Sequence, residues 1–174
     1  MISNVKRGAL AGLVAGAVFG LVLQLASFRT PAGNRVLMMQ VIAQMSGFRG
    51  LFFGWAYHLF DCAIMGAVFG ALFGARVSGY REGVKYGSLF GLACWILGGL
   101  FLMPIFFGMS LFSPNTLEPI APVAFQSLIG HCIFGGMLGY TYLFLGRKNK
   151  IVPVSEIRHD REYERKEEPR TKVS

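Results

Sequence analysis

Charged side chains are scarce in the first 146 residues of this 174-residue chain, which contain 11 of its 26 charged residues. A soluble domain of this size needs about a quarter of its residues charged to cover its surface. The shortage excludes an ordinary cytosolic globular enzyme. The last 28 residues contain the other 15 charges. The chain therefore divides into a transmembrane domain, residues 1–146, and a charged tail, residues 147–174, which we expect to be flexible and cytoplasmic.

Catalytic and cofactor motifs are also lacking. No HExxH, GxSxG, P-loop or CxxC pattern is present, so the sequence offers no catalytic residues and no metal site. The three cysteines fall within apolar segments, where free thiols pack as small hydrophobic side chains. The formal net charge of +8 does not indicate a nucleic-acid partner, because the basic residues cluster at the ends of apolar segments. We therefore expect a protein that is not an enzyme.

Long apolar segments are what the sequence does contain. Four of them stand out, at residues 8–27, 55–75, 86–107 and 123–145. Each is long enough to cross a hydrocarbon core of about 30 Å as a helix. A lone strand could not satisfy its backbone polar groups in lipid. The sequence therefore predicts an all-α polytopic membrane protein with four transmembrane helices in the lipid bilayer, the third of them kinked by Pro104.

Glycine recurs within these segments, mostly at intervals of four residues. Such spacing places glycines on one ridge of a helix, where the missing side chains let two backbones approach closely. The pattern predicts a tightly packed glycine-rich bundle. We also expect this bundle to associate with itself or with a larger membrane complex. The expected packing residues are Gly8, Gly12, Gly16, Gly20, Gly66, Gly70, Gly74, Gly87, Gly91, Gly135 and Gly139.

An internal repeat relates the two halves of the domain. Residues 5–24 match residues 84–103 at nine positions with an offset of 79. The second and fourth segments match more weakly with an offset of 69, for example at Gly66 and Gly135. The repeat predicts two similar helical hairpins of the same topology. Independent use of glycine in unrelated helices is the alternative explanation.

The basic residues favour one orientation in the membrane. They flank the start of the first segment, the turn between the second and third, and the end of the fourth: Lys6, Arg7, Arg76, Arg81, Lys85, Arg147, Lys148 and Lys150. By the positive-inside rule both termini are cytoplasmic, although Arg29, Arg35 and Arg49 lie in the first outer loop. Within that loop, residues 34–45 are typical of a short amphipathic helix with Asn34 as its N-cap.

Polar side chains inside the segments are few, and each is a candidate for function. The notable ones are His58, Asp61, Gln126 and His131, with both histidines on glycine ridges and the ionisable residues in the outer half of the bilayer. Three interpretations are open. Asp61 forms a hydrogen-bonded pair with a histidine that fixes helix register, or the three ionisable residues relay protons or ions in a small transporter or channel subunit, or His58 and His131 ligate haem b.

The second half of the chain resembles a known family. The run Gly87-Ser88-Leu89-Phe90-Gly91, then Pro104, then Ser127-Leu128-Ile129-Gly130-His131, is similar to small bacterial inner-membrane proteins of the YagU type. Those proteins place a Gly-His pair at the start of their last helix and a histidine early in a preceding helix, which His131 and His58 match. The resemblance implies a bacterial inner-membrane protein linked to acid tolerance, and it implies no mechanism.

Overall fold

Four long helices make up most of the structure. The computed structural model describes residues 2–25, 27–29, 35–106, 108 and 114–148. The long helices are α1 (Ile2–Leu25), α3 (Leu51–Phe73), α4 (Tyr80–Cys94) and α6 (Pro114–Lys148). Each contains a stretch long and apolar enough to cross a membrane, with α4 continued by the next segment: Ser3–Leu25, Leu51–Phe73, Tyr80–Leu102 and Ala124–Gly146. The predicted fold class of four apolar helices is confirmed.

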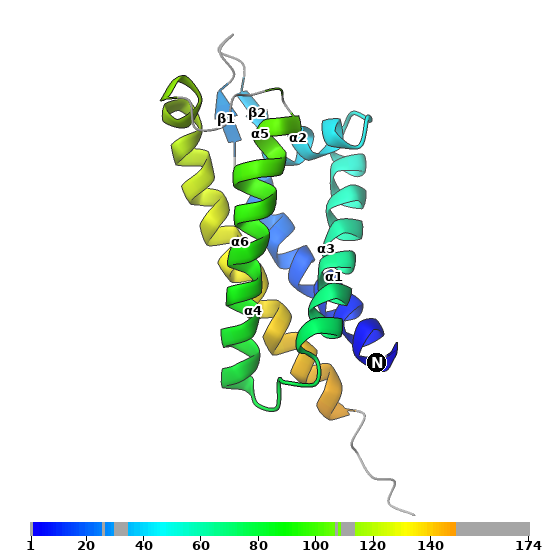
Figure 1. Ribbon diagram of the computed structural model, residues 1–174. Coiled ribbons are helices and arrows are strands. Elements are labelled where there is room, and N and C mark those ends of the chain that lie inside the picture. The colour runs from blue at the N-terminus through cyan, green and yellow to red at the C-terminus, as the bar shows by residue number, and fades with distance from the viewer. Residues whose placement is uncertain (1, 26, 30–34, 107, 109–113, 149–174) are drawn as a thin grey trace, which may run out of the picture.

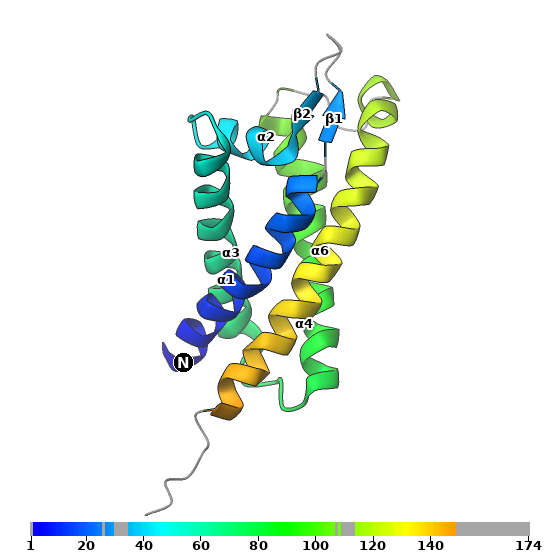
Figure 2. The same cartoon turned by 180° about the vertical axis from the view of Figure 1, so that it is seen from behind.

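The helices pack as two hairpins. The most extensive contacts join α1 to α3 and α4 to α6, and α1 also packs along α6. Figure 2 shows α1 crossing the molecule between α3 and α6. The start of α1, the turn from α3 to α4 and the end of α6 all lie at one end of the bundle (Figure 1). We call this the terminal end, and the opposite end, which carries the loop after α1, the loop end.

Backbone-to-backbone contact holds α1 against α3. A Cβ atom added to Gly8 would collide with the carbonyl oxygen of Gly66, and one added to Gly12 would collide with that of Cys62. Further toward the terminal end, a Cβ atom on Gly70 would collide with the carbonyl oxygen of Asn4. A helix pair this close gains dispersion contacts between backbones that any larger residue would prevent.

The second hairpin repeats the same contacts. Cβ atoms added to Gly87, Gly91 and Gly139 would collide with the carbonyl oxygens of Gly135, His131 and Gly83 respectively. The sequence offsets of 79 for the first helix and 69 for the second convert each of the three contacts named for the first hairpin into one of these. The pair Gly8–Gly66, for example, becomes Gly87–Gly135. The three backbone contacts of one hairpin thus have counterparts in the other. This agreement supports a duplicated hairpin over independent use of glycine in unrelated helices.

The other expected packing glycines also face neighbouring elements. A Cβ atom on Gly16 would lie against the Cys62 side chain, one on Gly20 against the Trp55 ring and one on Gly74 against the Tyr142 hydroxyl.

The third membrane span differs most from its predicted form. It begins at Tyr80 instead of residue 86, and after Cys94 the chain continues as a π-helix, η1 (Trp95–Leu102), and a short α-helix, α5 (Met103–Phe106). Proline cannot donate to a carbonyl four residues back and clashes with it. The wider turns before Pro104 are one way to relieve that clash, and the Met103 amide bonds to Gly98, five residues back.

The loop after α1 also departs from the prediction. Strands β1 (Ser27–Arg29) and β2 (Arg35–Leu37) form a two-stranded antiparallel sheet, and only then does helix α2 (Met38–Met45) begin. The predicted start at Asn34 lies outside the described residues. The Gln40 side chain accepts a hydrogen bond from the Leu37 amide at 3.1 Å, which supports a helix start at this point. The apolar side of α2 is buried, mainly against α3.

The fourth span lies within a longer helix than predicted, because α6 already begins at Pro114. The charged tail from residue 149 onward lies outside the described residues.

Candidate functional site

His58 is a buried residue of α3 that bonds to α1. Its side chain is 5% exposed, and its Nε2 atom lies 2.9 Å from the carbonyl oxygen of Gly16. Because a carbonyl only accepts, Nε2 carries the hydrogen of this bond. The Cys62 Sγ atom lies 3.6 Å from the same nitrogen. His58 therefore joins the two helices of the first hairpin.

His131 bonds within its own helix. Its Nδ1 atom donates to the carbonyl oxygen of Ser127, one turn earlier in α6, at 2.8 Å, and the Ser127 hydroxyl lies 3.3 Å from that nitrogen. The side chain is half-buried. The two candidate histidines thus have different roles in packing, one between helices and one within a helix.

The ring of Phe19, on α1, lies against both histidines. Its centroid is 5.3 Å from that of His58 and 4.9 Å from that of His131, with both pairs edge-on. A third contact joins Phe19 to Phe134 at 5.9 Å. Phe19 is itself buried. The phenyl ring therefore takes up space beside both imidazoles.

This packing does not fit haem b. Two axial histidines would have to face each other across a macrocycle, whereas here Phe19 packs on both and the His58 Nε2 atom is bonded to Gly16. The glycines on the same ridges as the two histidines contact the facing helices. In the described part of the chain, no group of three or more His, Cys, Asp and Glu side chains gathers as a metal site would.

Asp61 lies on the side of α3 that faces α4, and its side chain is exposed. Residues one turn apart on a helix share a face. Met65 and Phe69, one and two turns after Asp61 on α3, both contact α4. Met65 lies 3.9 Å from Cys94 by their sulfur atoms, and the ring of Phe69 lies 5.7 Å from that of Phe90. Within the described residues, the Asp61 carboxylate makes no hydrogen bond or ion pair, and both histidines have backbone partners instead.

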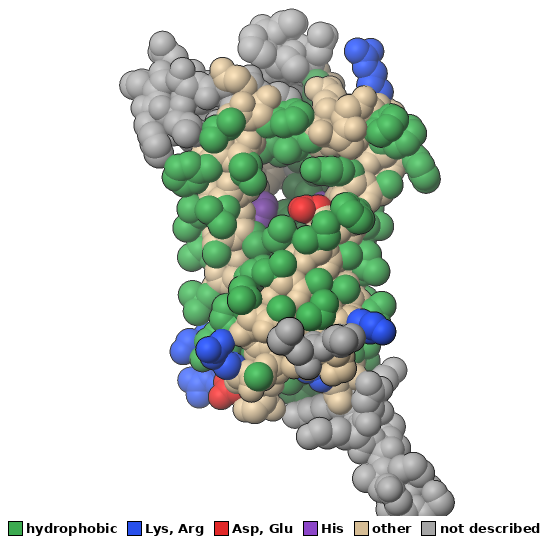
Figure 3. Space-filling model, turned by 45° about the vertical axis from the view of Figure 1, so that its right-hand side comes forward, with side chains coloured by type: hydrophobic (Ala, Val, Ile, Leu, Met, Phe, Trp, Pro, Cys, Tyr) green, Lys and Arg blue, Asp and Glu red, His purple; other side chains and the backbone are tan. Residues whose placement is uncertain are grey.

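An opening separates α3 from α4 on the loop-end side of these contacts. Toward the terminal end the two helices touch through aromatic rings, including Phe73 on Tyr86 at 5.6 Å. Toward the loop end they diverge, and a Cβ atom added to Gly98 of η1 would meet no heavy atom of another described segment within 4 Å. Figure 3 shows a hollow here, with an imidazole inside and a carboxylate at the rim. Two acidic residues have side chains that the structure describes, Asp61 and Glu82, and only Asp61 lies at this level, because Glu82 is in the first turn of α4.

The depth of Asp61 is greater than the sequence suggested. Because α3 begins at Leu51 and not at Trp55, Asp61 lies about 15 Å from the start of the helix at 1.5 Å per residue. That places the carboxylate near the middle of the span. Gln126, the fourth candidate, is exposed on α6 and, within the described part of the chain, makes no hydrogen bond with this group.

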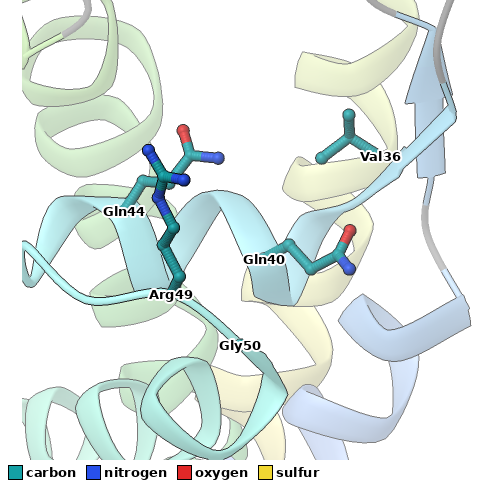
Figure 4. A pocket seen from close by; sticks show the side chains of 5 residues that line it. All are labelled: Val36, Gln40, Gln44, Arg49 and Gly50. Atoms are coloured by element: carbon teal, nitrogen blue, oxygen red, sulfur yellow. The ribbon is translucent and has the colours of Figure 1, made fainter.

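A second hollow lies at the loop end of the molecule. It has a volume of about 250 Å³ and is lined by Val36, Gln40, Gln44, Arg49 and Gly50. Figure 4 shows the Arg49 and Gln44 side chains beside each other along its edge. The pocket is shallow, and the Gln40 carbonyl already caps α2.

Phe19 and Gly98 are the two site residues that sequence reasoning missed. A phenylalanine and a glycine among apolar residues attract no attention individually. The signal that could have found them is the offset of 79, under which Phe19 corresponds to Gly98 within the stretch that matches at nine positions.

No protein-family model, curated protein or solved structure matches this chain.

Proposed function

We propose that this protein is a non-enzymatic membrane protein that serves as a subunit of a larger membrane complex. The observation that carries the proposal is the exposed Asp61 carboxylate in the middle of α3, which makes no hydrogen bond or ion pair within the described residues. An ionised side chain at the centre of a transmembrane helix costs about 2.5–3.5 kcal/mol on insertion scales. A partner chain that covers Asp61 and pairs with it would remove this cost.

The location that we propose is a bacterial inner membrane with both termini cytoplasmic. Support comes from the basic residues at the terminal end, namely Lys6, Arg7, Arg76, Arg81 and Lys85. The loop end carries fewer, including Arg35 and Arg49. By the positive-inside rule, the end richer in Lys and Arg faces the cytoplasm. The resemblance to inner-membrane proteins of the YagU type supports the same membrane.

The test is purification from native membranes in a mild detergent. The chain, tagged after residue 174, should elute as a particle larger than its own oligomers and contain at least one other chain in a constant ratio. An unrelated four-helix membrane protein with the same tag and expression level is the control. Recovery as a monomer or a pure homo-oligomer, with no second chain in constant ratio, would contradict the subunit role.

Proton or ion handling by Asp61, His58 and His131 is the second candidate. It is favoured by the hollow that contains both a carboxylate and an imidazole (Figure 3). Against it, the contact between α3 and α4 toward the terminal end is made by aromatic rings such as Phe69, Phe73 and Phe90. Reconstituted protein should lose its proton flux in both Asp61→Asn and His131→Ala while remaining folded. Equal flux in empty and protein-containing liposomes would exclude this candidate.

A further inference from the structure

We propose that the opening between α3 and α4 binds a transmembrane helix of another protein, and that a Lys or Arg side chain of that helix pairs with Asp61. This inference rests on the subunit role proposed above and names the chemistry of the partner. Three observations support it: a broken internal symmetry, an open position at Gly98 on the facing segment, and the placement of this chain's own basic residues.

The internal symmetry is broken at the opening. If the two hairpins were related by a two-fold axis, the contact of α1 with α6 would have an equivalent between α4 and α3. The first of these interfaces is extensive and the second is sparse. The duplicated hairpins therefore leave one of two equivalent flanks uncovered.

One pair of positions accounts for this difference. In the closed interface, Phe19 fills the space beside Gly130, whose added Cβ atom would collide with the phenyl ring. With the offsets of 79 and 69, Phe19 corresponds to Gly98 and Gly130 corresponds to Asp61. The open interface thus has a glycine where the closed one has the filling ring. A carboxylate stands where the closed interface has a glycine.

The space next to Gly98 is open, and the facing side of α3 is mostly apolar. Among the residues that the structure describes, no other segment has a heavy atom within 4 Å of a Cβ atom added to Gly98. On α3, the side chains of Tyr57, Phe60 and Ile64, which surround Asp61, are all exposed. A segment that enters this space from lipid must satisfy its own backbone hydrogen bonds, and a helix does so. A protein segment that occupies this space is therefore an apolar helix.

The charge of the occupant follows from the charges of this chain. The described basic side chains lie toward the two ends of the bundle, whereas Asp61 lies about 15 Å along α3. No described Lys or Arg of a second copy would reach this depth, and a two-fold pair would bring Asp61 toward Asp61. Two like charges near each other in a low dielectric repel strongly. A foreign helix with a basic residue at this depth supplies the missing cation.

The experiment uses the full chain reconstituted in liposomes with synthetic transmembrane peptides. The probe is a poly-Leu/Ala helix with one Lys at its centre, and the matched control has Leu in place of Lys. A third peptide carries the Lys two turns closer to one end. Energy transfer between labelled protein and labelled peptide measures binding. We expect the central-Lys peptide to bind at least about tenfold more tightly than either control.

Two variants locate the site. Asp61→Asn should remove the preference for the Lys peptide, so that all three peptides bind alike. Gly98→Phe should fill the opening as Phe19 fills its equivalent and reduce binding of the central-Lys peptide at least about tenfold. Leu97→Phe, one residue away at an exposed position, is the matched control and should bind like the wild type. Size-exclusion profiles of the variants check that each is folded.

Several results would overturn the docking site. These are equal binding of the Lys and Leu peptides by wild-type protein, an unchanged Lys preference in Asp61→Asn, and a homodimer that Gly98→Phe abolishes. Displacement of the central-Lys peptide by dodecylamine at a lower concentration than by unlabelled peptide would also overturn it, in favour of a small-amine site. A native complex that survives Asp61→Asn would exclude this docking site and leave the subunit role intact.

Discussion

The His58 imidazole donates a buried hydrogen bond of 2.9 Å to the carbonyl oxygen of Gly16, on the other helix of its hairpin. His131 lies in the second hairpin and donates instead to Ser127 in its own helix. The two histidines therefore differ in what their loss would do. A bond between helices is lost when they separate, whereas a bond within one helix survives separation.

His58→Phe should destabilise the protein by about 1 kcal/mol, and His131→Phe by less. Phenylalanine keeps an aromatic ring next to Phe19 and removes only the hydrogen-bonding nitrogens. Hydrogen bonds between membrane helices contribute about 0.6 kcal/mol on average and up to about 1.7. Thermal or denaturant unfolding in detergent, followed by circular dichroism, measures both losses. A larger loss for His131→Phe would contradict the roles assigned to the two rings.

Gly66→Ala and Gly135→Ala should each destabilise the bundle by about 1–3 kcal/mol. Each added methyl group would collide with a backbone carbonyl, of Gly8 or of Gly87, and backbones cannot yield as a flexible side chain can. Because the two positions are equivalent in the repeat, the losses should agree within about 1 kcal/mol.

Gly98→Ala is the matched control for these two variants. Its methyl group would enter open space, so the free energy of unfolding should stay within about 0.5 kcal/mol of the wild type. A loss at Gly98 as large as at Gly66 would show that the opening is closed in the membrane.

Much of this fold can be predicted because lipid limits the choice of structure. An apolar run such as residues 55–75 must be a helix, and its glycine ridge indicates which side meets a neighbour. The π-helix before Pro104 and the strands around residues 27–37 could not be predicted, since both depend on local backbone geometry more than on composition.

The sequence could predict which residues belong to the candidate site, but not how the helices that carry them are arranged. The rarity of charge inside the spans singles out Asp61, and the histidines follow from the same reasoning. Helical spacing places Asp61 beside His58, but it does not show that α3 and α4 diverge at that level. The closed and the open interface differ at Phe19 and Gly98, which are ordinary residues unless the two halves of the chain are compared.

Phe19→Ala should be the most destabilising of the substitutions proposed, at about 3–5 kcal/mol. The ring packs on His58, His131 and Phe134, so its removal leaves a cavity where the two hairpins meet. Phe125→Ala is the matched control, because that ring is exposed on α6 and should cost less than about 1 kcal/mol. Equal unfolding midpoints for the two variants would contradict the role of Phe19 as the filling residue.

Single cysteines at the two ends of the bundle should report its orientation in cells. Phe48→Cys lies in the exposed loop between α2 and α3, and Ser78→Cys lies in the turn between α3 and α4. With both termini cytoplasmic, a membrane-impermeant maleimide should label Phe48→Cys in intact cells and Ser78→Cys only after permeabilisation. The native cysteines fall within the spans, and the wild-type protein measures their background. The reverse labelling would place the termini outside, and the three arginines of the first loop would then be the residues that set the topology.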